Sequence, residues 1–437
     1  MTQKSVPGVL SGPIAPYLLR QSLIFFLGLV CLSSLSLVDV YFIGRIGAEA
    51  LTAVGFSTPV FLMGFNVILS LGTGITAVVS RVIGADTEKV PAFARGSLLW
   101  GFLTGLLLGL LGWALHDSLF GLMGAGAEVQ HFLRPYMHVL YLSFPVMGLL
   151  VAGLSVIRAY GAAQGPTRIM LLIVILNVAL DPLFMFGWGP FPDLGMVGAA
   201  WATFVALAVG LLITFRALKG MPWHPVAPVG GREIWAIALP SAGTRLLLPV
   251  SGTLITGMLA DFGDAAVAAY GIGYRIDVTL LMYMIALSSV MAPFVGQNYG
   301  ARHIERLRTG FRVSLVFALA YGLLMALVLW LGHDWLGGRF TRDVEILAVL
   351  DLYYQIVPWG YAFNGILMLS NALLNVLHRP RRAALLSIIH TLVFYVPLAW
   401  WAFEIRSLTM LFAAYPVSLL LAAGLGSVWG LRRLQAL

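Results

Sequence analysis

The chain has 437 residues, of which 60% are hydrophobic and only 10% charged, with a formal net charge of +8. A soluble protein carries about 25% charged residues, so this composition excludes a soluble globular chain and indicates a polytopic membrane protein. The apolar residues form continuous runs rather than short alternating segments, which excludes a transmembrane β-barrel. The single cysteine allows no internal disulfide and no metal-binding cysteine pair.

Hydropathy divides the chain into twelve apolar segments that are long enough to cross a bilayer, which takes about 20 mostly apolar residues. Their approximate ranges are 14–42, 52–80, 93–115, 133–157, 167–187, 195–217, 234–260, 268–296, 310–332, 350–377, 383–403 and 408–431. The sequence therefore predicts an all-α polytopic protein of twelve transmembrane helices, surrounded by the lipid bilayer.

The basic residues indicate the orientation of these helices. Most of the 26 Lys and Arg residues fall into one set of alternate loops and the two termini. Because cytoplasmic loops carry an excess of Lys and Arg, we expect both termini to be cytoplasmic, in a multi-pass protein of the bacterial inner membrane. The same asymmetry accounts for the positive charge, so nucleic acid is not expected as a partner.

The two halves of the chain repeat each other. Gly47–Gly55 returns as Gly263–Gly271, about 216 positions later, and His116-Asp117 returns as His333-Asp334. Each half has six segments, an even number, so both halves enter the membrane in the same direction. The sequence thus predicts two six-helix bundles related as a parallel repeat. The predicted boundaries are 1–217 for the N-terminal lobe, 218–231 for a cytoplasmic linker rich in Pro and Gly, and 232–437 for the C-terminal lobe.

An acidic residue, Asp181, lies in the middle of the fifth apolar segment. Inserting such a residue costs roughly 2.5–3.5 kcal/mol, and intramembrane acids are candidates for function. Asn177 precedes it by four residues and shares its helix face, and Pro182 follows it and removes a backbone donor. Asp39 is the only other acid that we place as deep. The alternative is that Asp181 is neutral and only ties helices together.

The repeat makes the two halves electrically unequal. The position equivalent to Asp39 is Ile255, and that equivalent to Asp181 is Val396. We therefore expect the deep carboxyl groups in the N-terminal half alone. Acids that serve only helix packing would be expected in both halves, whereas acids that bind an ion need be present in only one half.

Two buried carboxyl groups can bind a proton, because a low dielectric disfavours their charged form and two neighbours cannot easily ionise together. Asn177 and the hydroxyl of Thr203 can stabilise either protonation state by hydrogen bonding. The oxygens of Asp39, Asn177, Asp181 and Thr203 could equally surround Na⁺, so the residues leave H⁺ and Na⁺ open. No other metal is expected.

Two further groups are candidates for a substrate cleft. Tyr136 and Tyr141, in or near the fourth segment, could contact a flat organic cation through their rings. Asn364, Asn371 and Asn375 share one face of the tenth segment and either line the cleft or join helices by hydrogen bonds.

Small residues in the third segment predict close helix packing rather than a site. Gly101, Gly105 and Gly109 recur at every fourth position, the spacing that allows two helices to approach closely.

Enzyme motifs are absent from the sequence. It has no HExxH, no GxSxG, no Walker A lysine motif and no GxGD. We therefore expect no enzyme activity and no cofactor. Without a nucleotide-binding loop, transport would draw its energy from an H⁺ or Na⁺ gradient.

Several of these motifs together resemble the multidrug and toxic compound extrusion (MATE) transporters. The matching stretches are Val38–Leu51, Arg158–Gly161, Asn177–Pro182 and Gly198–Thr203. The resemblance covers nearly the whole chain. It implies a V-shaped pair of six-helix lobes that exports organic, often cationic, amphiphiles in exchange for H⁺ or Na⁺.

The resemblance is closer to the DinF-like branch than to the NorM-like branch. The NorM-like branch carries acids in its seventh and tenth spans, whereas Ser251–Leu259 and Ile356–Val376 have no central acid. The DinF-like resemblance implies a cation site in the N-terminal lobe, formed by Asp39, Asn177, Asp181 and Thr203.

The sequence as a whole predicts a monomeric antiporter that exports amphiphilic organic cations against protons. Three alternatives remain open at this point. The first is coupling to Na⁺. The second is a lipid-linked oligosaccharide flippase of related architecture, which would need several cleft arginines where only Arg245 is a candidate. The third is a membrane enzyme or scaffold, whose activity would not depend on an ion gradient.

Overall fold

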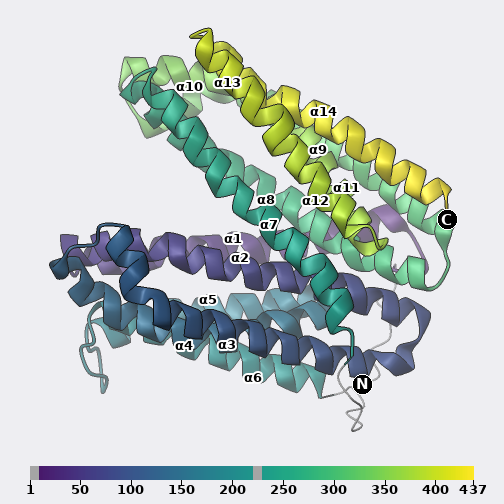
Figure 1. Ribbon diagram of the computed structural model, residues 1–437, viewed down its shortest axis with the longest axis horizontal. Coiled ribbons are helices and arrows are strands. Elements are labelled where there is room, and N and C mark those ends of the chain that lie inside the picture. The colour runs from purple at the N-terminus through teal and green to yellow at the C-terminus, as the bar shows by residue number, and fades with distance from the viewer. Residues whose placement is uncertain (1–8, 220–228) are drawn as a thin grey trace. The chain divides into compact units, whose positions relative to one another are not determined.

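The computed structural model describes residues 9–219 and 229–437, and all regular structure within these residues is helical (Figure 1). The elements of the first half are α1 (Ile14–Gly44), α2 (Ala48–Ala85), η1 (Thr87–Lys89), α3 (Val90–Leu122), α4 (Ala127–Ala159), α5 (Gln164–Met185) and α6 (Met196–Leu218). Those of the second half are α7 (Gly231–Ala260), α8 (Asp264–Gly300), α9 (Ile304–Phe340), α10 (Val344–Ile356), η2 (Val357–Gly360), α11 (Tyr361–Val376), α12 (Pro380–Ile388), η3 (Ile389–Tyr395), α13 (Val396–Glu404) and α14 (Leu408–Gln435). The all-α prediction is confirmed.

Eleven segments within the described residues are long and apolar enough to cross a membrane. The remaining predicted crossing, 350–377, falls on α10, η2 and α11 in series. The 3₁₀ turn η2 contains Pro358, which has no backbone N–H to continue the α-helical hydrogen bonding, and it therefore interrupts the helix. The twelfth crossing is thus an interrupted helix and not a missing one.

The chain divides into two compact units. Among the described residues, the N-terminal unit contains Leu27–Leu239, and the C-terminal unit contains residues 9–26 together with Pro240–Leu437. This division differs from the predicted boundaries in α1 and α7, each of which contributes residues to both units. Most of the predicted linker, 218–231, lies outside the described residues.

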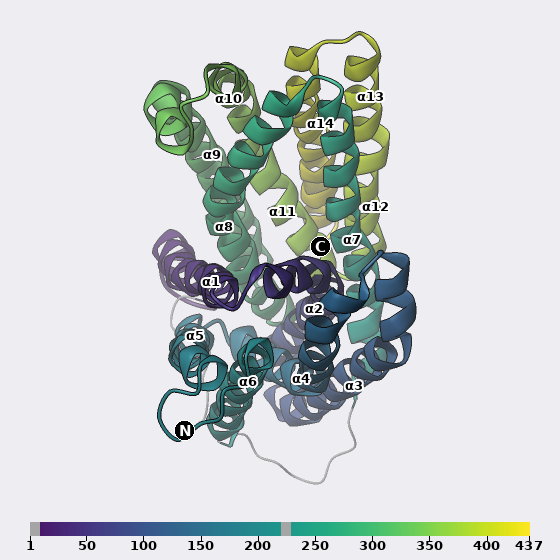
Figure 2. The ribbon, with the colours of Figure 1, turned by 90° about the vertical axis from the view of Figure 1, so that its left-hand side faces the viewer.

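In the N-terminal unit, α4 packs against α2, α3 and α6, and these helices form one group in Figure 2. Gly101 and Gly105 on α3 lie against the backbone of α4. A Cβ atom added to Gly101 would come within 2.5 Å of the Gly148 carbonyl oxygen, and one added to Gly105 within 2.2 Å of the Phe144 carbonyl oxygen. The predicted packing role of the glycine stripe is confirmed.

The same contact recurs in the C-terminal unit. Gly322 on α9 faces the backbone of Ala362 on α11, and a Cβ added to it would lie 2.3 Å from the Ala362 Cα. In the repeat, Gly322 corresponds to Gly105 and Ala362 to Pro145, at a shift of about 217 residues. The repeat found in the sequence is therefore also a repeat of helix packing.

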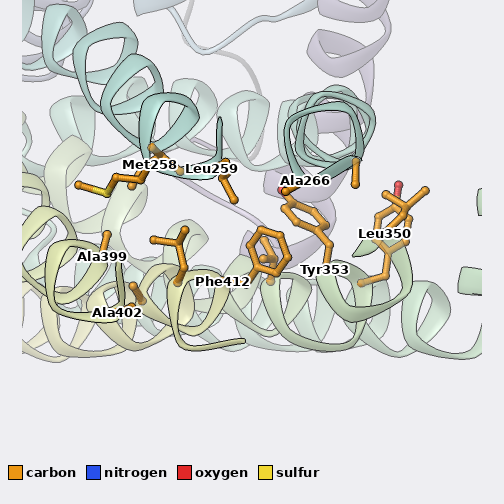
Figure 3. Packing of buried hydrophobic residues seen from close by; sticks show 14 of the residues in the cluster. Met258, Leu259, Ala266, Leu350, Tyr353, Ala399, Ala402 and Phe412 are labelled. Atoms are coloured by element: carbon orange, nitrogen blue, oxygen red, sulfur yellow. The ribbon is translucent and has the colours of Figure 1, made fainter. Parts of the chain in front are cut away.

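The C-terminal unit has its own apolar core between α7, α8, α10, α13 and α14 (Figure 3). Met258, Leu259, Leu350 and Phe412 are all less than 10% exposed there. Tyr353 lies among them with its ring against Phe412, at 5.1 Å between ring centres. Its hydroxyl brings a polar group into this core.

Candidate cation site

Three helices of the N-terminal unit supply the four predicted coupling residues. Asp39 lies on α1, Asn177 and Asp181 on α5, and Thr203 on α6. The spacing of four residues places Asn177 and Asp181 on the same face of α5, and both are 0% exposed. The structure therefore brings together residues that are more than 160 positions apart in the sequence.

The amide of Asn177 is the centre of this cluster. With its nitrogen towards the acids, it donates to Asp39 Oδ1 at 3.1 Å and to Asp181 Oδ2 at 3.2 Å, and its oxygen accepts from the N–H and the hydroxyl of Thr203, both at 3.1 Å. The opposite orientation gives a single bond, from Nδ2 to Thr203 Oγ1. We assign the first orientation because it satisfies all the groups around the amide.

One oxygen of the cluster lacks a partner. Asp181 Oδ1 is buried and has no hydrogen bond. The carboxyl groups of Asp39 and Asp181 lie within hydrogen-bonding reach of each other. Two ionised carboxylates have no proton to share, so a single proton bound to either group would supply the missing donor.

The donor set is suited to a proton or a hard cation. Two carboxyl groups, one amide oxygen and one hydroxyl offer only oxygen ligands, the type that hard cations prefer. With the amide turned as assigned, however, its nitrogen points at the carboxyl groups and its oxygen points at Thr203. This arrangement fits a shared proton directly, and it leaves the carboxyl and hydroxyl oxygens as ligands for Na⁺, with the amide oxygen turned away from the acids.

The two predicted cleft tyrosines lie in different surroundings. Tyr136 on α4 is close enough to Asp39 and Asp181 for their charges to act on it. Tyr141 is only 1% exposed, lies against Gly112 of α3, and has its hydroxyl 3.4 Å from His116 Nδ1. The structure thus places Tyr136 near the cation site and Tyr141 in the contact between α3 and α4.

The three asparagines of the tenth segment lie on α11 in the C-terminal unit. Asn364 donates to the hydroxyl of Tyr415 on α14 at 2.9 Å, and Asn371 donates to Ser387 on α12 at 3.0 Å. Asn375 is partly exposed. Two of the three therefore join neighbouring helices by hydrogen bonds, which was one of the two interpretations of their pattern.

One expectation is wrong: the deep carboxyl groups are not confined to the N-terminal half. Asp277 on α8, in the C-terminal unit, is only 5% exposed. It accepts a hydrogen bond from the Tyr353 hydroxyl at 2.6 Å and another from Tyr361. The positions equivalent to Asp39 and Asp181 in the second half do not include Asp277, so comparing the two halves could not reveal this acid. In the sequence, Tyr270 and Tyr274 shortly before Asp277 are the feature that indicates aromatic neighbours for this acid.

These features define a polytopic helical protein with buried acids in both units and a cluster of four polar side chains in the N-terminal one. The MatE family model matches residues 25–183 and 240–401, which cover most of the chain. The chain belongs to the MATE family of transporters, and like its relatives it is not an enzyme.

The relatives cover almost the full length of this chain. It is 33% identical over 423 residues to the FAD transporter of Shewanella oneidensis, which covers 95% of this chain and 94% of the relative. It is 26% identical over 396 residues to the multidrug export protein MepA of Staphylococcus aureus, covering 87% and 86%.

Solved structures of the family have the same fold. The MATE transporter VcmN of Vibrio cholerae in its bent form is similar with a TM-score of 0.91 and 30% identity over 97% of both chains. A MOP superfamily transporter of Pyrococcus furiosus matches with a TM-score of 0.87 and 24% identity over 99% of both chains, a similarity that concerns the fold alone.

Proposed function

We propose that this MATE transporter exports amphiphilic organic cations in exchange for protons by alternating access, with Asp39, Asn177, Asp181 and Thr203 as the coupling site. The observation that carries the proposal is the buried Oδ1 of Asp181, which lacks a donor beside a second carboxyl group. A bound proton satisfies that oxygen and removes the repulsion between the two acids. The multidrug export protein among the relatives supports drug efflux as the process.

The transport cycle follows from the charge of this site. Protons that load the two carboxyl groups from the outside remove the negative charge that holds a cationic substrate, so substrate is released there. Loss of the protons to the cytoplasm restores the charge and the affinity for the next cation. One charge moving inward across 100 mV supplies ~2.3 kcal/mol for this exchange.

Tyr136 is the aromatic residue that we assign to substrate contact, because it lies beside the two acids. A ring next to negative charge suits a flat, positively charged compound. For Tyr141, Asn364, Asn371 and Asn375, a place in the substrate cleft stays a prediction from the sequence.

We place the protein in a bacterial inner membrane as a monomer, with both termini in the cytoplasm and with no cofactor besides the ion gradient. The distribution of Lys and Arg between alternate loops supports this orientation.

Purified protein in liposomes tests the proposal directly. Uptake or release of a fluorescent cationic dye is measured with an imposed pH gradient at zero Na⁺, and then with an imposed Na⁺ gradient at equal pH. We expect dye movement with the pH gradient only. Dye movement driven by Na⁺ alone would assign the same residues to sodium, and movement without any gradient would contradict antiport.

Export of flavin adenine dinucleotide is a second candidate function. It is favoured by the relative named as an FAD transporter, which is 33% identical over nearly the whole chain. The same liposomes loaded with FAD distinguish the candidates. FAD is an anion with a flat ring system, so competition between FAD and the cationic dye would show whether both use one site.

A further inference from the structure

A histidine and two aspartates form a cluster in the C-terminal unit, at the end of α9 and on α10. Their ligand atoms, His333 Nδ1 and one carboxylate oxygen each of Asp334 and Asp351, all lie within 4.8 Å of one another. His333 Nδ1 is 3.1 Å from Asp334 Oδ1 and also contacts Asp351 Oδ1. None of these residues belongs to the cation site described above.

The repeat shows what is unusual about this cluster. The equivalent dipeptide in the N-terminal unit is His116-Asp117 on α3, and Asp117 forms an ion pair with Arg134 on α4. Asp351 stands at the position equivalent to Arg134, at the same shift of about 217 residues that relates the glycine contacts. The change from arginine to aspartate turns an ion pair into two facing carboxylates.

The C-terminal cluster therefore lacks the guanidinium group that balances the acid in the N-terminal unit. Among the ion pairs of the described residues, none brings a Lys or Arg to Asp334 or Asp351. Like charges at this distance repel, and solvent screens the half-exposed Asp351 carboxylate less than it screens the exposed Asp334 carboxylate. The imidazole nitrogen between them is a metal ligand as well as a base.

Two of the three ligand atoms are shielded from solvent and face each other. His333 Nδ1 and Asp351 Oδ1 are both buried and without a hydrogen bond. Gln355 donates to the other oxygen, Asp351 Oδ2, at 2.9 Å, which orients the carboxylate with Oδ1 towards His333. The Asp334 side chain is 93% exposed and leaves a path for an ion to enter.

We propose that His333, Asp334 and Asp351 bind a divalent zinc ion. Zinc takes imidazole nitrogen and carboxylate oxygen at about 2.0–2.2 Å, so the ligand atoms of a tetrahedral site stand roughly 3.3 Å apart. The spacing of the three atoms accommodates this with small side-chain rotations, and water fills the fourth position. The ion ties the end of α9 to α10, just before the interruption at η2. In the predicted orientation this site faces the outside of the cell.

Zinc binding to the full-length protein tests the proposal. The protein is purified in detergent through a tag without histidine, treated with EDTA, and titrated with Zn²⁺ by calorimetry, with bound metal counted after equilibrium dialysis. The informative variants are His333→Ala, Asp351→Arg and Gln355→Leu. Asp351→Arg restores the ion pair of the N-terminal unit, so it removes the metal site without leaving a charge unpaired. His116→Ala is the matched control, because it changes the same dipeptide in the other unit.

We expect one zinc ion per wild-type and per His116→Ala chain, and none above background for His333→Ala and Asp351→Arg. Loss of the oriented carboxylate in Gln355→Leu should weaken binding about tenfold. Zinc should raise the melting temperature of the wild type and leave that of Asp351→Arg unchanged. Equal zinc binding by the wild type and Asp351→Arg, or no binding by either, would overturn the proposal, and the melting temperature without metal shows that Asp351→Arg is folded.

Discussion

Replacing Asp181 by asparagine removes one of the two acids of the cation site while keeping the size of the side chain. In the wild type, Asp39 Oδ1 and Asp181 Oδ2 lie 3.1 and 3.2 Å from the same Asn177 nitrogen, so they are no more than about 6 Å apart. Even at this upper limit of about 6 Å, two full charges repel by about 3 kcal/mol at an effective dielectric of about 20, and they repel more at the hydrogen-bonding separation of the pair. Binding of one proton relieves this repulsion.

The variant loses that repulsion and therefore the reason for the pair to exchange a proton during the cycle. Asp39 is left as a single carboxylate that accepts a hydrogen bond from Asn177. When both carboxyl groups carry a proton inward for each singly charged cation exported, one net charge moves down 100 mV and sustains about a fifty-fold substrate gradient. We expect Asp181→Asn to abolish this gradient and to lower pH-driven export at least tenfold, while dye binding persists.

Dye transport in liposomes and dye binding by fluorescence polarisation measure the two effects separately. Asp193→Asn is the control, because Asp193 is an exposed acid in the loop before α6 that accepts a hydrogen bond from the Gly195 N–H. Export by Asp181→Asn at the wild-type rate, with wild-type dependence on the pH gradient, would refute the coupling role of the pair.

Three further changes test other parts of the structure. Thr203→Val should slow export several-fold because the hydroxyl that Asn177 accepts from is lost, at a cost of about 1 kcal/mol, and Thr203→Ser should restore it in the same liposome assay. Asp277→Ala should lower stability by about 2–6 kcal/mol because two buried tyrosine hydroxyls lose their acceptor, whereas Asp277→Asn should retain proton coupling; thermal melting and dye export check the two statements. Gly105→Ala should destabilise by about 1–3 kcal/mol or more because the added Cβ meets the backbone of α4, while Gly121→Ala, with open space around it, should not lower the melting temperature.

Much of the fold could be predicted because the relevant signals are local. Continuous apolar runs identify the membrane segments, and the spacing between Asn177 and Asp181 places both on one helix face without any knowledge of tertiary structure. That Asp39 and Thr203 join them depends on how α1 and α6 approach α5. Helix packing of this kind leaves little trace in one sequence. Asp39 was chosen for its depth in the first apolar segment and Thr203 as a hydroxyl that can hydrogen-bond, and the family resemblance supported both choices.

The sequence was less informative about polar groups that are satisfied by distant partners. Asp277 was not singled out in the sequence, because its tyrosine partners lie more than 70 positions away on α10 and α11. That Asp351 lies beside His333 and Asp334 also became clear only from the contact between α9 and α10. In both cases the residue type was visible in the sequence, and its neighbours were not.

The backbone contact between α3 and α4 has a consequence for the motion that transport requires. Where Gly101 and Gly105 touch the main chain of α4, no side chains are present whose rotamers could yield, so the two helices can slide past each other only by breaking contact altogether. We therefore expect α3 and α4 to move together as one rigid body. The opening and closing of the path to the acids then falls to α1, α5 and α6, the helices that carry the four side chains themselves.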